Sequence, residues 1–370
     1  PERQTTANKE GKDYLNAILK AGVEVGQDSR LGISWVNSED DRTQFPNEHS
    51  YNIERNQSSI EYNTKIAGFN LAASVYRSTS DNDLIEQTYI HRLEEDVATI
   101  DINGALNESH FLTAGLEYSK EEYHKDYNAE SENEFRDNFK SWSAFAQDRF
   151  EISDRISLTW GARYDDHERF GDAISPKAHL NWDVTDNWQI KTGYSEGFKA
   201  PAVKDASDDY YFSYSYPIGF GPMGPTAFLK NEFIGNSDLK EETSKTFEIG
   251  ANYSSGNLSG GFTIFRSDVK DLINANEISR VTMGPLTTST SRYENVANAD
   301  IFGLESEIGY QFTPNLDAEF NLSLIDHEDS STGKWLTLRS QVEANLSVTH
   351  RLSELGLKTR LQVKYNGKQY

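Results

Sequence analysis

The residues able to catalyse a reaction do not occur in the patterns that an enzyme needs. Cysteine is absent, which excludes thiolate zinc sites, iron–sulfur clusters, disulfides and cysteine nucleophiles. The eight histidines are scattered and show no metal-binding spacing. Where Ser109 adjoins His110, the two side chains would point apart on a strand, whereas a hydrolase needs them to converge. We therefore expect neither an enzyme nor a cofactor or metal.

The residues best suited to binding are aromatic and basic. Five aromatic residues lie close together in the longest polar segment, Gly197–Glu242: Tyr210, Tyr211, Phe212, Tyr214 and Tyr216. Such rings can stack on a planar ligand, and phenols can form hydrogen bonds to it. Arg92, Lys125, Arg136 and Lys199 are candidate partners for an anionic ligand. The aromatic residues could instead pack the segment onto itself or rest at a lipid interface, and the sequence leaves both interpretations open.

Composition narrows the class of protein. The 370 residues carry 36 basic and 59 acidic side chains, a net charge of −23, so a nucleic-acid partner is not expected. No apolar run approaches the roughly 20 residues of a membrane-spanning helix. Aromatic residues make up 12% of the chain, which argues against disorder, yet mean hydropathy is −0.71. A chain in which every second residue is apolar would give this average.

Apolar and polar residues do alternate along the chain. Across Leu316–Leu324 the even positions are apolar and the odd positions are polar, and Phe302–Phe312, Ile156–Tyr164 and Phe247–Tyr253 alternate likewise. A period of two predicts half-exposed β-strands. The whole scan predicts about sixteen strands, with centres near Ala17, Ile33, Ile60, Leu71, Ile100, Ala114, Ala144, Leu158, Leu180, Ile190, Ile249, Phe262, Leu304, Phe320, Ala344 and Leu361.

The connections between these strands alternate in length. Short polar turns such as Gly26–Arg30 and Thr313–Asn315 alternate with long segments such as Asn37–Tyr51, Gly197–Glu242 and Ser267–Arg292. This wiring is typical of outer-membrane barrels, which have tight periplasmic turns and extended external loops.

The two faces of the predicted strands differ in chemistry. One face carries aliphatic and aromatic residues, with Trp160 and Trp188 placed for an interfacial girdle, while the other carries charges such as Arg163, Lys191 and Glu319. Buried charges would be costly in a dry core, whereas a water-filled interior accepts them. We expect an all-β fold, an antiparallel transmembrane β-barrel in outer-membrane lipid. The alternative is a soluble antiparallel sheet with one solvated face.

The directions of the first and last predicted strands indicate whether the barrel is complete. If the short turns are periplasmic, the strand near Ala17 runs inward from the outside and the strand near Leu361 runs outward. A complete bacterial barrel begins and ends in the periplasm, so we expect residues 1–370 to be a partial barrel domain that lacks its terminal strands.

Four segments resemble the motifs of one family, the TonB-dependent receptors. Gly193–Pro201 reads GYSEGFKAP and is similar to their GYxxGFKAP segment. Asp238–Gly250 resembles LKPExS…ExG, although Glu241 stands at the usual proline. Phe265–Ile273 resembles FxNDxKDxI, and Tyr293–Glu305 resembles YxNV…A…GxE. The order and spacing of the four segments strengthen the resemblance, whose nearest subgroup is the enterobactin and colicin I receptor type.

The motif residues have an architectural interpretation. Proline cannot donate to a strand ladder, and glycine relaxes the backbone at the rim of a sheet. We expect the motif residues to shape the rim rather than to contact ligand: Gly197, Phe198, Lys199, Ala200, Pro201, Leu239, Lys240, Glu242, Asn295, Gly303 and Glu305.

The resemblance implies a 22-stranded barrel with a plugged lumen, of which this chain would supply roughly strands four to nineteen without the plug or the TonB box. It also implies a receptor in the outer membrane of a Gram-negative bacterium. Such a receptor binds a ferric siderophore or another metal chelate at its external loops, and the TonB complex energises uptake through the plug. A passive porin-type diffusion channel and a receptor-fold docking or adhesion protein without transport remain alternatives.

The predicted loops are acidic, with Asp205, Asp208 and Asp209 among their residues. A trianionic ferric catecholate would be repelled there unless basic residues cluster locally. The acidic loops could otherwise be a solvated surface bridged by divalent cations.

Overall fold

The computed structural model describes residues 11–44, 49–84, 89–127, 134–221, 224–330, 333–335 and 340–368. These residues form 19 β-strands in one sheet and a single 3₁₀ turn, η1 (Ser353–Leu355). No helix in the described part of the chain is long and apolar enough to cross a membrane.

Sixteen strands form a continuous antiparallel wall, and each contains one of the strand centres predicted from alternation, which confirms that prediction. The wall follows the chain through β10, continues from β10 directly to β13, and ends with β16, β18 and β19. The strands of the wall are β1 Gly11–Glu24, β2 Arg30–Gln44, β3 His49–Ile66, β4 Phe69–Leu84, β5 Tyr89–Ala105, β6 His110–Tyr127, β7 Phe135–Ser153, β8 Ile156–His167, β9 Gly171–Asp183, β10 Trp188–Lys199, β13 Glu242–Ser255, β14 Leu258–Met283, β15 Leu286–Thr313, β16 Leu316–Asp329, β18 Val342–Leu352 and β19 Leu357–Asn366.

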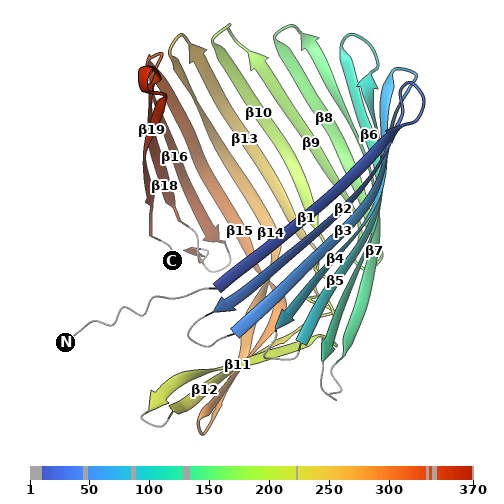
Figure 1. Cartoon of the computed structure of the whole chain (residues 1–370), viewed down its shortest axis with the longest axis vertical. Helices are drawn as coiled ribbons and strands as arrows, with labels where there is room; N and C mark the ends of the chain where they lie inside the picture. Colours follow the sequence, from blue (N-terminus) through green and yellow to red (C-terminus); the bar gives the residue numbers. More distant parts are fainter. Residues whose placement is uncertain are drawn as a thin grey trace, which may run out of the picture.

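The wall curls into an open trough (Figure 1). Short turns lie at its upper end in that view and the long connections at its lower end, as the sequence predicted. β1 runs toward the short turns and β19 runs away from them. Among the described residues β1 pairs only with β2 and β19 only with β18, so these two strands are the edges of the sheet.

The long connections contain more strand than the sequence predicted. β2 continues to Gln44 inside the expected connection Asn37–Tyr51, and β14 and β15 extend through Ser267–Arg292 to a turn at Gly284, where φ is 60°. Backbone hydrogen bonds hold these extensions together whatever the side chains are. Apolar alternation does not reveal these extensions, because the end of β2 is polar on both faces and the apolar residues of β14, such as Leu272 and Ile273, do not keep a period of two.

The segment Gly197–Glu242, predicted as one loop, also contains a hairpin. β11 (Tyr211–Gly221) pairs antiparallel with β12 (Gly224–Ile234), and β12 runs parallel to the extension of β15, from Phe228 opposite Leu286 to Ile234 opposite Arg292. A two-residue strand, β17 (Lys334–Trp335), pairs with the end of β16. These three strands lie outside the wall and were missed.

The two faces of the wall have the predicted chemistry. Large apolar side chains remain exposed on the outer face, among them Trp160, Ile308 and Leu361 at 54%, 53% and 67% exposure. Charged groups pair on the concave face, where Arg163 donates to Glu117 over 2.8 Å. The residues that alternation assigned to lipid are therefore not enclosed in a dry centre.

Candidate functional site

The buried core lies at the long-connection end of the trough. The chain leaves the wall after Lys199, and residues 200–210 fold over the wall, with Val203 and Ala206 fully buried. Tyr210 is 3% exposed, and its ring centroid lies 5.5 Å from that of Phe135 and 5.9 Å from that of Tyr123. This packing gives the departing segment a fixed position.

Hydrogen bonds fix the segment where the chain returns to the wall, over the same core. The Gly235 amide donates to the Tyr210 carbonyl over 3.1 Å, and the Asn236 amide donates to the Asp205 carbonyl over 2.8 Å. The Asn236 side chain accepts a bond from Arg292 at 2.7 Å and donates to the Tyr293 carbonyl at 2.9 Å. The two ends of the excursion are thereby fastened to each other and to β15.

A cavity of about 610 Å³ lies beside this core. Its lining includes Lys199 and Asp205 from the departing segment, Ser119 and Ser141 from the wall, and Tyr293 from β15. The Lys199 ammonium lies 3.0 Å from a carboxylate oxygen of Glu242, yet its side chain is 74% exposed. The cavity therefore combines hydroxyl groups, a phenol and the exposed ammonium of Lys199 with the carboxylates of Glu121, Asp205 and Glu242.

Three lysines surround three tyrosine rings next to the cavity, and we call these six residues the tyrosine–lysine cluster. Lys204 Nζ lies 5.3 Å from the ring centroid of Tyr293 and 5.9 Å from that of Tyr210. Two more ammonium groups each lie 5.9 Å from the centroid of the Tyr211 ring, on Lys125 and Lys230. Lys125 also donates to the Tyr211 carbonyl. The cluster gathers three basic residues, of which Lys204 and Lys230 pair with Asp205 and Glu232 at 3.4 and 2.8 Å and Lys125 is 1% exposed.

Electrostatics favour the charged form of Lys204, whereas burial lowers the pKa of Lys125. Burial alone would lower the pKa of Lys204, but Asp205, whose carboxylate lies 3.4 Å away, and the neighbouring tyrosines raise that pKa above its ordinary value. Burial raises the pKa of the Asp205 carboxyl and outweighs the opposing effect of Lys204. Burial also raises the pKa of the Tyr210 phenol, which stays protonated at neutral pH. Because Tyr210 is 3% exposed, the ammonium groups rather than this phenol are the donors available to anionic oxygen atoms.

Lys199 is the only one of the four predicted basic residues that lines the cavity, while Lys125 lies in the tyrosine–lysine cluster. Arg92 and Arg136 lie on the opposite face of the sheet, because they alternate with His91 and Phe135, which contact the core. Arg92 donates to Asp81 over 2.7 Å, and Arg136 pairs with Glu122.

The predicted aromatic residues divide into two groups. Tyr210 is buried in the core, and Phe212 packs at its edge, 5.2 Å from the His91 ring. Tyr214 and Tyr216 continue along β11, where their ring centroids lie 6.1 Å apart and nearly parallel. Tyr211 lies in the tyrosine–lysine cluster. Packing of the segment against β5, β6 and β7 of the wall therefore accounts for Tyr210 and Phe212.

The predicted motif residues connect the four motifs to one another. The Asn295 side chain accepts a bond from the Lys240 amide at 2.9 Å and donates to the carbonyls of Lys240 and Asp271 at 3.0 and 2.7 Å. Glu242 accepts bonds from the Ile273 amide at 2.8 Å and from Lys199 at 3.0 Å. Side chains of the second and fourth motifs thus hold all four segments at the rim.

Five of the other motif residues occupy the same rim, whereas Gly303 and Glu305 lie farther along β15, away from it. Gly197 and Phe198 lie near the end of β10, Ala200 and Pro201 line the cavity, and Leu239 is 5% exposed in the core. Gly303 lies opposite Phe265 in the sheet.

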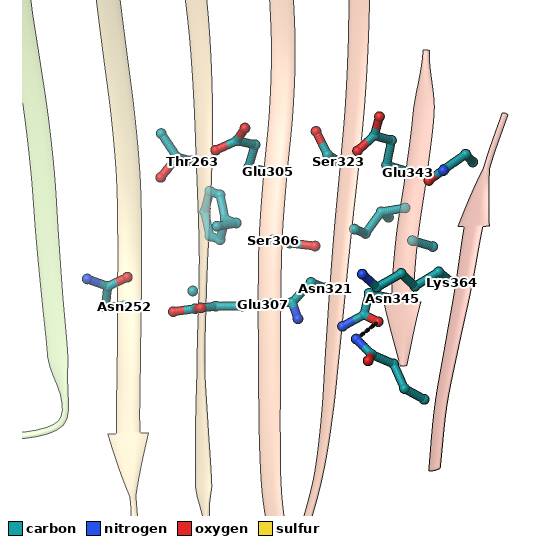
Figure 2. A pocket seen from close by; sticks show the side chains of 16 residues that line it. Asn252, Thr263, Glu305, Ser306, Glu307, Asn321, Ser323, Glu343, Asn345 and Lys364 are labelled. Carbon is teal, nitrogen blue, oxygen red and sulfur yellow. Dashed lines mark hydrogen bonds between the residues drawn. The ribbon is translucent and has the colours of Figure 1, made fainter. Parts of the chain in front are cut away.

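A second hollow, of about 720 Å³, lies farther along the concave face between β13 and β19. Figure 2 shows the predicted motif residue Glu305 there, with Glu307 on the same strand, β15, and with Glu343 on β18 and Lys364 on β19. Three carboxylates against one ammonium make this hollow unsuited to an anionic ligand.

Sequence reasoning did not single out Lys204 and Lys230 as functional. Both lie within Gly197–Glu242, on either side of the predicted aromatic group. Their proximity to the aromatic residues could have identified them as candidates for the site. The hairpin that directs Lys230 toward Tyr211 was not predicted.

The sequence profile described as "TonB dependent receptor-like, beta-barrel" matches residues 4–370. The chain belongs to this family. The TonB-dependent receptor barrel predicted from the four motifs is therefore confirmed, and the wall described above is part of such a barrel.

Two relatives are similar in sequence to part of this receptor barrel. The ferric enterobactin receptor of Pseudomonas aeruginosa is 29% identical over 234 residues, covering 62% of this chain and 31% of the relative. The iron-regulated outer membrane virulence protein of Vibrio cholerae (classical Ogawa 395) is 28% identical over 196 residues, covering 51% and 28%. The aligned part of this receptor barrel thus spans about a third of the length of these relatives.

A solved structure shares the fold over the whole chain. The crystal structure of a point mutant of the P. aeruginosa ferric enterobactin receptor superimposes on this receptor barrel with a TM-score of 0.83. Sequence identity is 20%, and the match covers 100% of this chain and 59% of the other. At this identity the likeness establishes the fold alone.

Proposed function

We propose that the receptor containing this chain binds a ferric siderophore at the tyrosine–lysine cluster and the adjoining cavity. The family match over residues 4–370, together with the ferric enterobactin receptor as a relative, is the observation that carries the proposal. The receptor would lie in the outer membrane of a Gram-negative bacterium and take up the chelate with energy from the TonB complex. The apolar outer face of the wall supports the membrane assignment.

The cluster suits an anionic, aromatic chelate. Tyr211 and Tyr293 offer faces and hydroxyl groups for stacking and hydrogen bonds, while Lys204 and Lys230 supply positive charge. Lys199 would extend this charge to the mouth of the cavity. Among siderophores we therefore propose a ferric catecholate, which carries both aromatic rings and negative charge.

Complementation tests this function. The intact gene is expressed in a Gram-negative host that makes no siderophore and lacks its own catecholate receptors, and growth is measured under iron limitation. We expect a ferric catecholate to restore growth only when the host TonB complex is functional. A ferric hydroxamate and haem serve as comparisons. Growth on one of these comparisons and not on the catecholate would contradict the substrate class.

The same experiment separates the alternatives. A passive channel would support growth without a functional TonB complex. A docking protein would bind the purified chelate or another partner without supporting growth. Absence of both catecholate binding and growth, with the protein correctly folded in the outer membrane, would overturn the proposal.

A further inference from the structure

One group of metal-ligating side chains lies on the other face of the sheet from the tyrosine–lysine cluster. It stands where β6 and β7 reach the long-connection end and comprises His124, Asp126 and Glu134. His124 Nε2 lies 2.9 Å from an Asp126 carboxylate oxygen and 3.3 Å from a Glu134 carboxylate oxygen. One ligand atom from each residue lies within 4.8 Å of the others.

The arrangement directs two carboxylates at one imidazole nitrogen. A single ring N–H cannot donate to both oxygens with good geometry, and an unprotonated nitrogen would present its lone pair to two negative charges. A divalent cation removes this conflict, because it accepts the lone pair and neutralises both carboxylates. We propose that His124, Asp126 and Glu134 bind a divalent transition metal ion of the zinc class.

The distances support such an ion. Zinc binds histidine nitrogen and carboxylate oxygen at ~2.0–2.2 Å, so the ligand atoms of a tetrahedral site lie about 3.3–3.6 Å apart. The His124–Glu134 separation of 3.3 Å matches this spacing, and the His124–Asp126 separation of 2.9 Å would need to widen by about half an ångström. The side chains of Asp126 and Glu134 are 44% and 72% exposed, so water can reach the ion and complete its coordination.

The neighbouring charges are balanced. Arg92 and Arg136 are the cross-strand neighbours of His124 on β5 and β7. Each guanidinium group has a carboxylate partner outside the proposed site, Asp81 for Arg92 and Glu122 for Arg136. The ion and its two carboxylate ligands add no net charge between these ion pairs.

The position suggests what the ion would do. The backbone pairing of β6 with β7 ends with Lys125 opposite Phe135, and Asp126 and Glu134 are the next residues beyond that pair. On the concave face Lys125 binds the carbonyl of Tyr211, and Phe135 contacts Tyr210. A metal ion would therefore fasten the two strands at the point where they support the tyrosine–lysine cluster.

Zinc titration of the intact receptor, purified in detergent and stripped with a chelator, tests the site. We expect one Zn²⁺ per chain by calorimetry and a tetrahedral visible spectrum with Co²⁺. His124→Ala and Glu134→Gln should each weaken Zn²⁺ binding at least tenfold. His110→Ala is the matched control and should leave binding unchanged. His110 also lies on a strand, but its imidazole contacts a single carboxylate, that of Asp148, at 2.7 Å.

Hydrogen exchange supplies a second measurement. Zn²⁺ should slow exchange of the backbone amides at the end of the β6–β7 pairing in the wild type and in His110→Ala, but not in His124→Ala. Heat-modifiable migration on gels verifies that each variant is folded. Failure of the folded wild type to bind Zn²⁺, or equal binding by folded His124→Ala, would overturn the proposal.

Discussion

The ring of Phe265 covers the backbone of Gly303 on the neighbouring strand. A Cβ atom at position 303 would lie closer than 3.0 Å to three carbons of that ring. The two residues face each other across β14 and β15, and they belong to the third and fourth motifs. Glycine at 303 therefore lets the Phe265 ring lie flat against the concave face.

We expect Gly303→Ala to destabilise the barrel by about 1–3 kcal/mol, because the Phe265 ring must leave its position. Denaturant unfolding followed by heat-modifiable migration measures the change. Phe265→Leu in the same chain should recover part of the loss. Gly32→Ala is the matched control, since the nearest atom to a Cβ there is 3.9 Å away. Equal effects of the two alanine variants would contradict the steric explanation.

Asn295→Ala should loosen the rim, because it removes three hydrogen bonds to Lys240 and Asp271. We expect a local loss of about 1–3 kcal/mol, seen as faster hydrogen exchange at the Lys240 amide. Asn295→Asp keeps an acceptor for that amide but loses both donated bonds, so its effect should be intermediate. Asn321→Ala, a lining residue of the acidic hollow, should leave that amide protected. Unchanged protection in Asn295→Ala would show that the side chain does not hold the motifs together.

Acidification should release the contact between Asp208 and Ser237. The hydroxyl and amide of Ser237 donate to the Asp208 carboxylate and lower its pKa below the ordinary value. A carboxyl group whose folded pKa is lowered contributes stability that is present above the unfolded pKa, about 3.9, and lost as pH falls through the folded value. We expect protection of the Ser237 amide to fall across that window.

Asp208→Asn isolates the charge in this experiment, because it keeps the shape of the side chain and cannot titrate. The pH dependence of Ser237 protection should disappear in Asp208→Asn and persist in Asp209→Asn. Exchange rates are compared between variants at each pH, so that the intrinsic dependence of exchange on pH cancels. Persistence of the wild-type dependence in Asp208→Asn would assign it to another group.

Lys199→Gln should weaken binding of a ferric catecholate to the intact receptor by about tenfold, equivalent to ~1.4 kcal/mol. Its ammonium group is exposed at the mouth of the cavity, whereas Arg92 and Arg136 face away from it. Arg92→Gln and Arg136→Gln should therefore have smaller effects. Lys358→Gln on β19 is the control for loss of one positive charge. Fluorescence quenching on titration with the chelate measures each affinity, and a larger loss in Arg92→Gln would move the site to the outer face.

The wall could be predicted from the sequence because one rule applies to each of its strands. Apolar and polar residues alternate around Phe320 and Leu361 as they do along the rest of the wall, so every strand of the wall was found. β11 and β12 do not show this alternation along their whole length. Tyr214, Ser215 and Tyr216 alternate, but Pro217 and the glycines that follow look like a loop.

The candidate site could be predicted only in part, because it is assembled from segments far apart in the chain. Lys125, Lys230 and Tyr211 meet through β6 and the missed hairpin, and neither sequence spacing nor composition specifies that meeting. Alternation could have shown that Arg92 and Arg136 lie on the outer face, since His91 and Phe135 are their neighbours.

The direct pairing of β10 with β13 has an evolutionary consequence. Twelve residue pairs join them, from Trp188 with Tyr253 to Lys199 with Glu242, as though the intervening 42 residues were absent. Mutation can lengthen, shorten or exchange that insertion without disturbing the ladder beneath it. Related receptors can thus acquire new cargo preferences while inheriting an unaltered scaffold.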